Sequence, residues 1–271
     1  MPRYPALSIG GVDGDLATAF ALDHDLIAGE SLPDGVQLHF SSGRQRDAAA
    51  RTIGARFPSA TLTAREVDDG DWARRSQENL GPVTVGRITV RPLHAVPGRD
   101  PTAEVVILPS MGFGTGHHAT TRLCLAGLQQ VPLEGRFVLD VGTGSGVLAF
   151  AARALGASRA LGIDNDPDAV HNARENQLLN PTLDQVSFQI GELGRDPLAP
   201  ADVVTANLTG AGLCRSAGLL IGATHPGGHL IVSGLLKTER EDVLTAFGLT
   251  PGWEASEDEW VAMCFTRPDS R

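Results

Sequence analysis

The residues Val138-Leu139-Asp140-Val141-Gly142-Thr143-Gly144-Ser145-Gly146 carry the clearest structural signal in this chain. A short apolar run is followed by three glycines at alternate positions, and the helix-forming run VLAFAARAL comes directly after them. Glycine permits a tight turn and lets a ligand approach the backbone closely. The start of a helix adds free N–H groups and a positive dipole end. The stretch therefore predicts a strand, a turn and a helix, with a ligand at the carboxyl end of the strand.

Outward from this stretch, short apolar segments alternate with helix-length segments. The strands expected after residue 103 are 104–108, 137–141, 160–163, 186–190, 203–206 and 229–233, and the expected helices are 120–130, 147–155 and 168–176. Alternation of this kind indicates βαβ units around a parallel sheet. The runs FVLDV and LIVSG are typical of strands covered on both faces. Residues 104–271 are therefore predicted to form one α/β domain.

The residues before this domain follow a different pattern. Residues 1–68 are predicted to form a smaller α/β domain, with strands at 4–9, 36–40 and 61–67 and helices at 16–23 and 44–57. Residues 69–103 are predicted to form a linker that carries a short helix at 72–79, a strand at 83–90 and a proline-rich loop at 92–101.

The net charge indicates which kinds of binding partner suit this protein, and the cysteines indicate its cellular compartment. The formal net charge of −10 argues against direct binding to nucleic acid phosphates. A basic macromolecule is a better match, although solubility alone also explains the acidity. Three widely separated cysteines form no metal or disulfide spacing, which suits a reducing cytoplasm. We find no signal-peptide run and no apolar stretch of about 20 residues, so we expect a cytoplasmic protein without membrane contact.

An acidic residue ends the strand after the glycine turn, and this pairing identifies a ligand class. A carboxylate at Asp164 can bind both hydroxyls of a ribose, although it can also cap the helix that follows. The glycine spacing is G-x-G-x-G rather than the dinucleotide G-x-G-x-x-G. Asp140 would repel a pyrophosphate but can orient a cationic amino-acid group, directly or through water. The pattern favours S-adenosylmethionine over a dinucleotide.

Two further segments carry polar groups toward the same edge of the predicted sheet. Residues 111–121 are Gly-rich and lead into a helix that Thr120 or Thr121 is expected to cap. Within this segment, His117 and His118 are adjacent and have no neighbouring Cys or carboxylate, so we expect no metal site. Asn207 ends another strand, and its carbonyl oxygen can accept a hydrogen bond from an amine. A role for Asn207 in the following turn is the alternative.

With these motifs in place, the chain resembles the ribosomal protein L11 methyltransferase family. Four segments carry the resemblance. Residues 113–121 are similar to the family pattern Phe-Gly-Thr-Gly-x-His-Pro-Thr-Thr, and residues 140–146 to Asp-x-Gly-x-Gly-Ser-Gly. Residues 162–167 are similar to Gly-Ile-Asp-x-Asp-Pro, and residues 207–208 to Asn-Ile/Leu. The resemblance runs from about residue 72 to the end. It implies a Rossmann-like seven-stranded methyltransferase sheet with a smaller N-terminal α/β domain.

The resemblance also implies roles for individual residues. It places Asn207 and Phe113 at the reacting groups, with Phe113 over the cofactor or the target amine. The implied contacts of S-adenosylmethionine are Thr121, Gly142, Asp164 and Asn207, with Gly144, Asp140, Thr115 and His118 as further candidates. The family methylates lysine side chains and an N-terminal amine, and its N-terminal domain holds the protein substrate. A basic protein, ribosomal protein L11, is therefore the implied partner.

The chain departs from the family pattern at three places. Ala119 replaces a proline, Thr209 follows Asn207-Leu208 where an aliphatic or small residue is usual, and Leu80-Gly81-Pro82 replaces an aromatic-Lys-Pro. The region before Trp72 also matches weakly. The motifs therefore support methyl transfer to an amine more strongly than they support L11 as the acceptor.

Three other functions compete with this interpretation. A small-molecule N-methyltransferase would use the same cofactor domain, with the N-terminal residues as a lid. A nicotinamide-dependent oxidoreductase is disfavoured, because G-x-G-x-x-G is missing and Tyr4 is the only tyrosine, which leaves no Tyr-x-x-x-Lys pair. A non-catalytic module would bind the cofactor without transferring its methyl group. For the methyltransferase, we expect a neutral amine to attack the cofactor's methyl group, with alignment as the main catalytic contribution.

Overall fold

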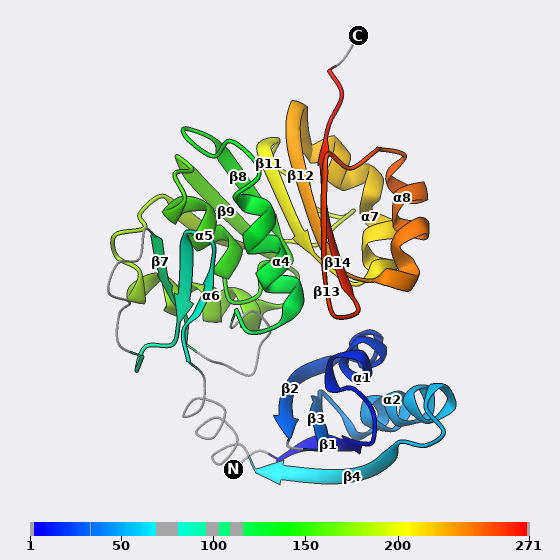
Figure 1. The fold of residues 1–271 in the computed structure, drawn as a ribbon. Coiled ribbons are helices and arrows are strands. Elements are labelled where there is room, and N and C mark those ends of the chain that lie inside the picture. Colours follow the sequence, from blue (N-terminus) through cyan, green and yellow to red (C-terminus); the bar gives the residue numbers. More distant parts are fainter. Residues whose placement is uncertain (1–2, 33, 69–80, 96–102, 109–115, 270–271) are drawn as a thin grey trace. The chain divides into compact units, whose positions relative to one another are not determined.

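The computed structural model describes residues 3–32, 34–68, 81–95, 103–108 and 116–269. These residues form two compact units, one from 3–32 and 34–68 and one from 81–95, 103–108 and 116–269 (Figure 1). Each unit has a hydrophobic core of its own, so each is described separately. The predicted helix at 72–79 lies outside the described residues.

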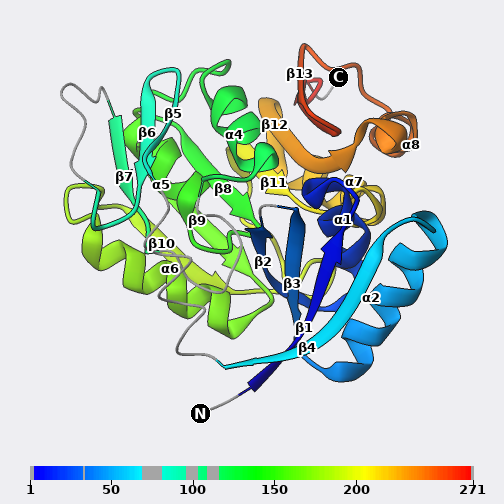
Figure 2. The same ribbon diagram turned by 60° about the horizontal axis from the view of Figure 1, so that its bottom comes forward.

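The N-terminal unit is a four-stranded antiparallel sheet with two helices on one face. Figure 2 shows the strand order β2-β3-β1-β4. Its elements are β1 (Arg3–Gly10), α1 (Gly14–Ala21), β2 (Leu26–Leu32), β3 (Gly35–Phe40), α2 (Gly43–Arg56) and β4 (Thr61–Asp68). Residues on both helices pack against Leu7 and Leu38, which pair across β1 and β3. This packing places α1 and α2 on the same face.

The helices of this unit begin where side chains cap them. Asp13 accepts a hydrogen bond from the Leu16 amide, and Ser42 accepts one from the Gln45 amide. The predicted strands and helices of this region are all present. Strand β2 was not predicted, because its Gly29, Glu30 and Ser31 have low strand propensity.

The larger unit is built on a seven-stranded sheet in the order β10-β9-β8-β11-β12-β14-β13. Figure 1 labels all of these strands except β10. The strands are β8 (Phe137–Val141), β9 (Arg159–Asp164), β10 (Val186–Ile190), β11 (Ala201–Asn207), β12 (Thr224–Leu236), β13 (Trp253–Glu257) and β14 (Trp260–Thr266). Strands β8 to β12 are parallel to one another, whereas β14 is antiparallel to both β12 and β13. The predicted seven-stranded Rossmann-like sheet is confirmed.

Helices cover this sheet on both faces and produce two separate cores. One face packs against α4 (Ala119–Leu128), α5 (Val147–Ala154) and α6 (Pro167–Leu179). The other packs against α7 (Gly210–Ala223) and α8 (Arg240–Phe247). Along β8, Val138 belongs to the first core and Leu139 to the second. This alternation explains why β8 is apolar at every position but Asp140.

Helices α7 and α8 and the hairpin β13–β14 were not predicted individually. The α7 sequence GAGLCRSAGLLIGA contains several glycines, which have poor helix propensity. Thr209 nevertheless caps it by accepting a hydrogen bond from the Gly212 amide. Packing of its apolar face on the sheet therefore outweighs the propensity of its residues. None of the described helices is long and apolar enough to cross a membrane.

The expected single strand at 83–90 is wrong, because this segment is a hairpin. Strand β5 (Val83–Val85) turns at Gly86, which has a φ of +55°, and returns as β6 (Ile88–Arg91). The side chain of Gln129 on α4 holds the turn by accepting from the Arg87 amide and donating to the Val85 carbonyl. Strand β6 also pairs in parallel with β7 (Ala103–Val106), which shares the core of α5.

Candidate active site

The glycine turn joins β8 to α5 and is attached to the end of β9. Gly142, Gly144 and Gly146 have φ values of +71°, +52° and +83°, in the left-handed region that glycine favours. The amides of Gly142 and Thr143 both donate to the Ile163 carbonyl, at 2.9 and 3.0 Å. A Cβ on Gly146 would lie 2.6 Å from the Phe188 ring. The turn therefore requires glycine for both conformation and space.

Asp140 holds this turn to the neighbouring strand from inside the protein. Its side chain is only 1% exposed, and its two oxygens accept hydrogen bonds of 2.6 Å from the hydroxyls of Thr143 and Thr205. Burial raises the pKa of Asp140 to about 6, although both hydroxyl donors oppose this shift. The contacts give Asp140 a structural role in the turn, and its predicted role toward the amino-acid group of the cofactor stays a prediction.

Asp164, at the end of β9, lies beside the turn. One carboxylate oxygen accepts from the Gly144 amide at 2.9 Å, and the other accepts from the Asp166 amide at 3.1 Å. Partial burial raises the pKa of Asp164 above its ordinary value. The cap of α6 is Asp166, which accepts from the Asp168 amide. Each oxygen of Asp164 retains a lone pair for a ligand.

Asn207 ends β11 at the same edge of the sheet. Its side-chain nitrogen donates to the Thr120 hydroxyl at 3.1 Å. Gly234 on the adjacent strand β12 has a φ of +90°, and a Cβ there would lie 3.0 Å from the Asn207 side-chain oxygen and 2.2 Å from the Leu208 carbonyl oxygen. Glycine at position 234 therefore leaves room for the Asn207 amide.

The start of α4 differs from the expectation. The predicted caps Thr120 and Thr121 are wrong, because the helix begins at Ala119 and His118 is its cap. The Nδ1 atom of His118 accepts from the Thr120 amide at 3.3 Å and so satisfies one of the free N–H groups of the first turn. Thr121 is buried in that turn, and its amide donates to the His118 carbonyl.

A bidentate ion pair fixes the start of α4 to the end of β13. Arg122 contacts both carboxylate oxygens of Glu257 from its Nε atom, at 2.9 and 3.1 Å. It also donates to the His117 carbonyl. The pair is half-buried and forked, so it is stronger than a single contact between two exposed charges. Sequence reasoning missed the pair, since the two residues are far apart in the chain.

The described site residues lie at the carboxyl ends of β8, β9 and β11 and at the start of α4. The group contains Asp140, Gly142, Gly144, Asp164, His118, Thr121 and Asn207. Phe113 and Thr115 lie outside the described residues. The sequence analysis did not predict the roles of Thr143 and Thr205 or the contact of Thr120 with Asn207. In the sequence, only their position in or beside the motifs points to these residues. Among the described residues, no cluster of His, Cys, Asp and Glu is suited to a metal ion.

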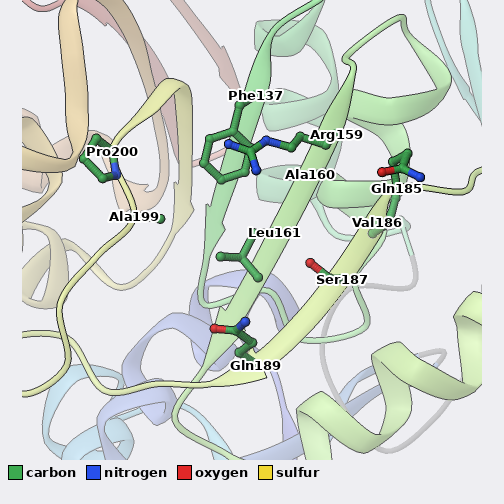
Figure 3. Close-up of a pocket in the computed structure, with 10 residues that line it drawn as sticks. All are labelled: Phe137, Arg159, Ala160, Leu161, Gln185, Val186, Ser187, Gln189, Ala199 and Pro200. Carbon is green, nitrogen blue, oxygen red and sulfur yellow. The ribbon is translucent and has the colours of Figure 1, made fainter.

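A cavity of about 610 Å³ lies elsewhere, over β8, β9 and β10. Figure 3 shows the residues that line it, among which the Arg159 guanidinium lies 4.0 Å from the centre of the Phe137 ring. Residues 191–200, which connect β10 to β11 and are all described, form no helix. That connection leaves this part of the sheet less covered than the part under α7 and α8. None of the candidate site residues lines the cavity.

The residues at the glycine turn fit an adenosyl cofactor. Gly142 and Gly144 are only partly buried, and a carboxylate with unused lone pairs ends the next strand. Together with the seven-stranded sheet and its antiparallel strand β14, these features define a Rossmann-like S-adenosylmethionine-dependent methyltransferase.

Comparisons with known proteins identify the family. The model of the ribosomal protein L11 methyltransferase family matches residues 41–268. A ribosomal protein L11 methyltransferase from Cupriavidus pinatubonensis is 41% identical over 228 residues, covering 82% of this chain and 74% of that protein. One from Myxococcus xanthus is 38% identical over 239 residues, covering 84% and 80%. The chain belongs to the ribosomal protein L11 methyltransferase family.

A solved structure supports the fold. The crystal structure of a ribosomal protein L11 methylase from Lactobacillus delbrueckii subsp. bulgaricus superimposes with a TM-score of 0.63 at 24% identity, covering 70% of this chain and 98% of that one. Family membership favours a protein methyltransferase over the nicotinamide-dependent oxidoreductase and over a small-molecule enzyme.

Proposed function

We propose that this enzyme transfers methyl groups from S-adenosylmethionine to lysine side-chain amines, an N-terminal amine, or both, of ribosomal protein L11. The observation that carries this proposal is the orientation of Asn207. Its amide nitrogen is engaged by Thr120, so its carbonyl oxygen is the atom left to accept a hydrogen bond from an amine. The names of the relatives from Cupriavidus pinatubonensis and Myxococcus xanthus support L11 as the acceptor.

The proposed cofactor site lies between the glycine turn and the start of α4. Asp164 would bind the ribose hydroxyls, and Gly142 and Gly144 would allow close approach of the cofactor to the backbone. Thr121, Thr115, His118 and Asp140 remain proposed cofactor contacts, and Phe113 would pack over the cofactor or the amine. When bound, the cofactor supplies an electrophilic methyl group on a sulfonium.

The chain's own residues would prepare the amine. A free lysine amine has a pKa near 10.4 and is mostly protonated at neutral pH. A site that excludes water disfavours the ammonium form and so lowers this pKa. Asn207 would accept an N–H of the neutral amine and direct the lone pair of its nitrogen. Positioning of this kind supplies a barrier reduction of up to about 7–11 kcal/mol in well-aligned reactions.

The domain roles and the setting belong to the same proposal. We assign residues 1–68 to recognition of the protein substrate, 69–103 to the connection and 104–271 to methyl transfer. The net charge of −10 suits a basic protein substrate rather than nucleic acid. A ribosomal acceptor and the scattered cysteines favour a cytoplasmic location.

A transfer assay tests the acceptor. The enzyme is incubated with methyl-labelled S-adenosylmethionine and the ribosomal proteins of its host, and in parallel with a pool of amine metabolites. We expect label in the L11 band, at lysine or the N-terminus by mass spectrometry. Label only in the metabolite pool would favour the small-molecule enzyme instead. Bound cofactor without transfer to any amine would favour a non-catalytic module.

A further inference from the structure

Three side chains from two distant parts of the chain form a continuous hydrogen-bonded series. His118 Nδ1 lies 2.8 Å from the Thr120 hydroxyl oxygen, and the same oxygen lies 3.1 Å from the side-chain nitrogen of Asn207. Thr120 is only 4% exposed, whereas His118 and Asn207 are half-buried. The series therefore runs from the start of α4 to the end of β11.

The direction of every hydrogen bond in this series follows from one backbone group. The Thr120 amide points at His118 Nδ1 at 3.3 Å, and a backbone amide only donates. His118 Nδ1 is therefore the acceptor, which places the proton of the neutral ring on Nε2. The Thr120 hydroxyl, bonded to the same Nδ1, must then donate its hydrogen to it. A lone pair of the hydroxyl oxygen is left to accept from Asn207.

This direction determines which end of the Asn207 amide faces Thr120. Because the hydroxyl hydrogen is used by His118, Thr120 presents an acceptor, and the NH₂ group of Asn207 turns toward it. The carbonyl oxygen must then point away from Thr120, into the space that Gly234 leaves open. The amide orientation thus depends on chemistry, not on the similar shapes of its two ends.

One aromatic ring packs against His118. The buried Trp260 packs edge-to-face against the imidazole, with ring centres 5.0 Å apart and an interplanar angle of 68°. A flipped ring would have almost the same shape, so the two contacts from Thr120, its amide and its hydroxyl, are what hold Nδ1 on this side. Hydrogen bonding therefore fixes the acceptor at the start of the series, and Trp260 limits the motion of the ring.

We propose that Thr120 is a positioning residue for methyl transfer, acting through Asn207. Its hydroxyl fixes the carbonyl oxygen of Asn207 as the group that meets the amine. Without the hydroxyl, the amide is free to rotate and to present its NH₂ group, which would donate to the amine lone pair and block its reaction. This inference rests on the proposed function of Asn207.

Two substitutions separate the hydroxyl from the shape of the side chain. Thr120→Val keeps the shape and removes the hydroxyl, and Thr120→Ser keeps the hydroxyl. We expect Thr120→Val to lower kcat on the order of tenfold while the cofactor Kd, measured by calorimetry, stays within about twofold. Thr120→Ser should restore kcat. Thr224→Val is the matched control, because it removes a buried hydroxyl that donates to the Leu220 carbonyl at the opposite edge of the sheet, and its kcat should not change.

A second measurement needs neither cofactor nor substrate. The side-chain amide protons of Asn207 are assigned by NMR through the loss of their signals in Asn207→Ala. We expect Thr120→Val to shift these signals and to speed their exchange with solvent, and Thr120→Ser to leave them near the wild-type values. Both variants are compared with Thr224→Val, so that a general loosening of the fold would be detected.

The outcomes test the positioning role of Thr120 separately from the proposed role of Asn207. A tenfold loss of kcat in Thr120→Val, rescued by serine and accompanied by the NMR change, supports it. Wild-type kcat and unchanged Asn207 signals in Thr120→Val, together with an inactive Asn207→Ala, overturn this inference alone. Wild-type kcat in Asn207→Ala overturns the proposed role of Asn207 and this inference with it.

Discussion

The two halves of the candidate site are built in different ways. In the cofactor half, the Gly144 amide and the Asp164 carboxylate are in contact across 20 residues of sequence, and the turn itself consists of consecutive residues. In the amine half, the contact between Asn207 and Thr120 spans 87 residues and joins two side chains. One half is therefore largely local backbone geometry, and the other is tertiary contact.

This difference predicts separate effects of mutation. Backbone amides and left-handed glycines should control folding and cofactor affinity, because they shape the turn whether or not an amine is present. The side-chain contacts around Asn207 should control kcat, because they act on the amine. Four experiments test this division, in order of decreasing expected effect.

The largest effect is expected at Gly146. Alanine there must adopt a φ of +83°, which costs about 1–2 kcal/mol. Its Cβ would also lie 2.6 Å from the Phe188 ring, and overpacking of this kind costs about 1–3 kcal/mol. Denaturant unfolding of Gly146→Ala should therefore show a loss of about 2–5 kcal/mol in the free energy of unfolding.

Gly135→Ala separates the two causes. Gly135 has a φ of +72°, and a Cβ there would meet no atom within 4 Å. The control should lose only the conformational part, about 1–2 kcal/mol. Equal losses in the two variants would show that crowding at Phe188 contributes nothing.

The next effect is the pH dependence that Asp140 gives to stability. Its folded pKa of about 6 lies above the ordinary value of 3.8, so the folded protein keeps a proton that the unfolded chain has released between these values. The free energy of unfolding should therefore fall as pH rises from about 4 to 6, by about 3 kcal/mol, and be level above that range.

The measurement compares wild type with Asp140→Asn. His39 changes stability in the opposite direction over the same range, because burial lowers its pKa to about 4. The difference between the two proteins' pH profiles removes this contribution. Relative to Asp140→Asn, wild type should lose stability as pH rises toward 6. Parallel profiles would contradict the raised pKa.

The third experiment acts on the amine half. Asn207→Ala removes the acceptor for the amine and should lower kcat about 100-fold, as misplacement of a reacting group does. The cofactor Kd should change far less, since the glycine turn is intact. Gln130→Ala removes an exposed amide on the same unit and serves as the control. If Asn207→Ala weakened cofactor binding as much as it lowers kcat, the two halves of the site would not act separately.

The smallest of the four effects is expected for Asp164→Ala. Loss of one charged hydrogen-bonding partner should weaken cofactor binding about tenfold or more by calorimetry. With saturating cofactor, kcat should stay near wild type. Asp184→Ala changes the net charge equally, because Asp184 is an exposed carboxylate that pairs with Arg153. Unchanged cofactor affinity in Asp164→Ala would remove the ribose assignment.

The predictions made from sequence were accurate where the signal was local. Strands β8 and β10 and the beginning of α5 match their expected bounds, because apolar runs and glycines mark them directly. The hairpin at 83–91 was expected as one strand, since Gly86-Arg87 is the only break in its alternation. The predicted cap of α4, Thr120 or Thr121, lies two or three residues after the observed cap His118, because histidine is an unusual cap whose role depends on its ring orientation.

The Rossmann-like sheet, the glycine turn and the cofactor class are predictable from the order of residues, because they follow from glycine conformation and hydrophobic periodicity within short segments. The burial of Asp140 between two hydroxyls and the contact of Thr120 with Asn207 emerge only in the folded protein. These contacts join residues from different strands and helices. Their geometry depends on how the sheet packs, and no local pattern of residues encodes it.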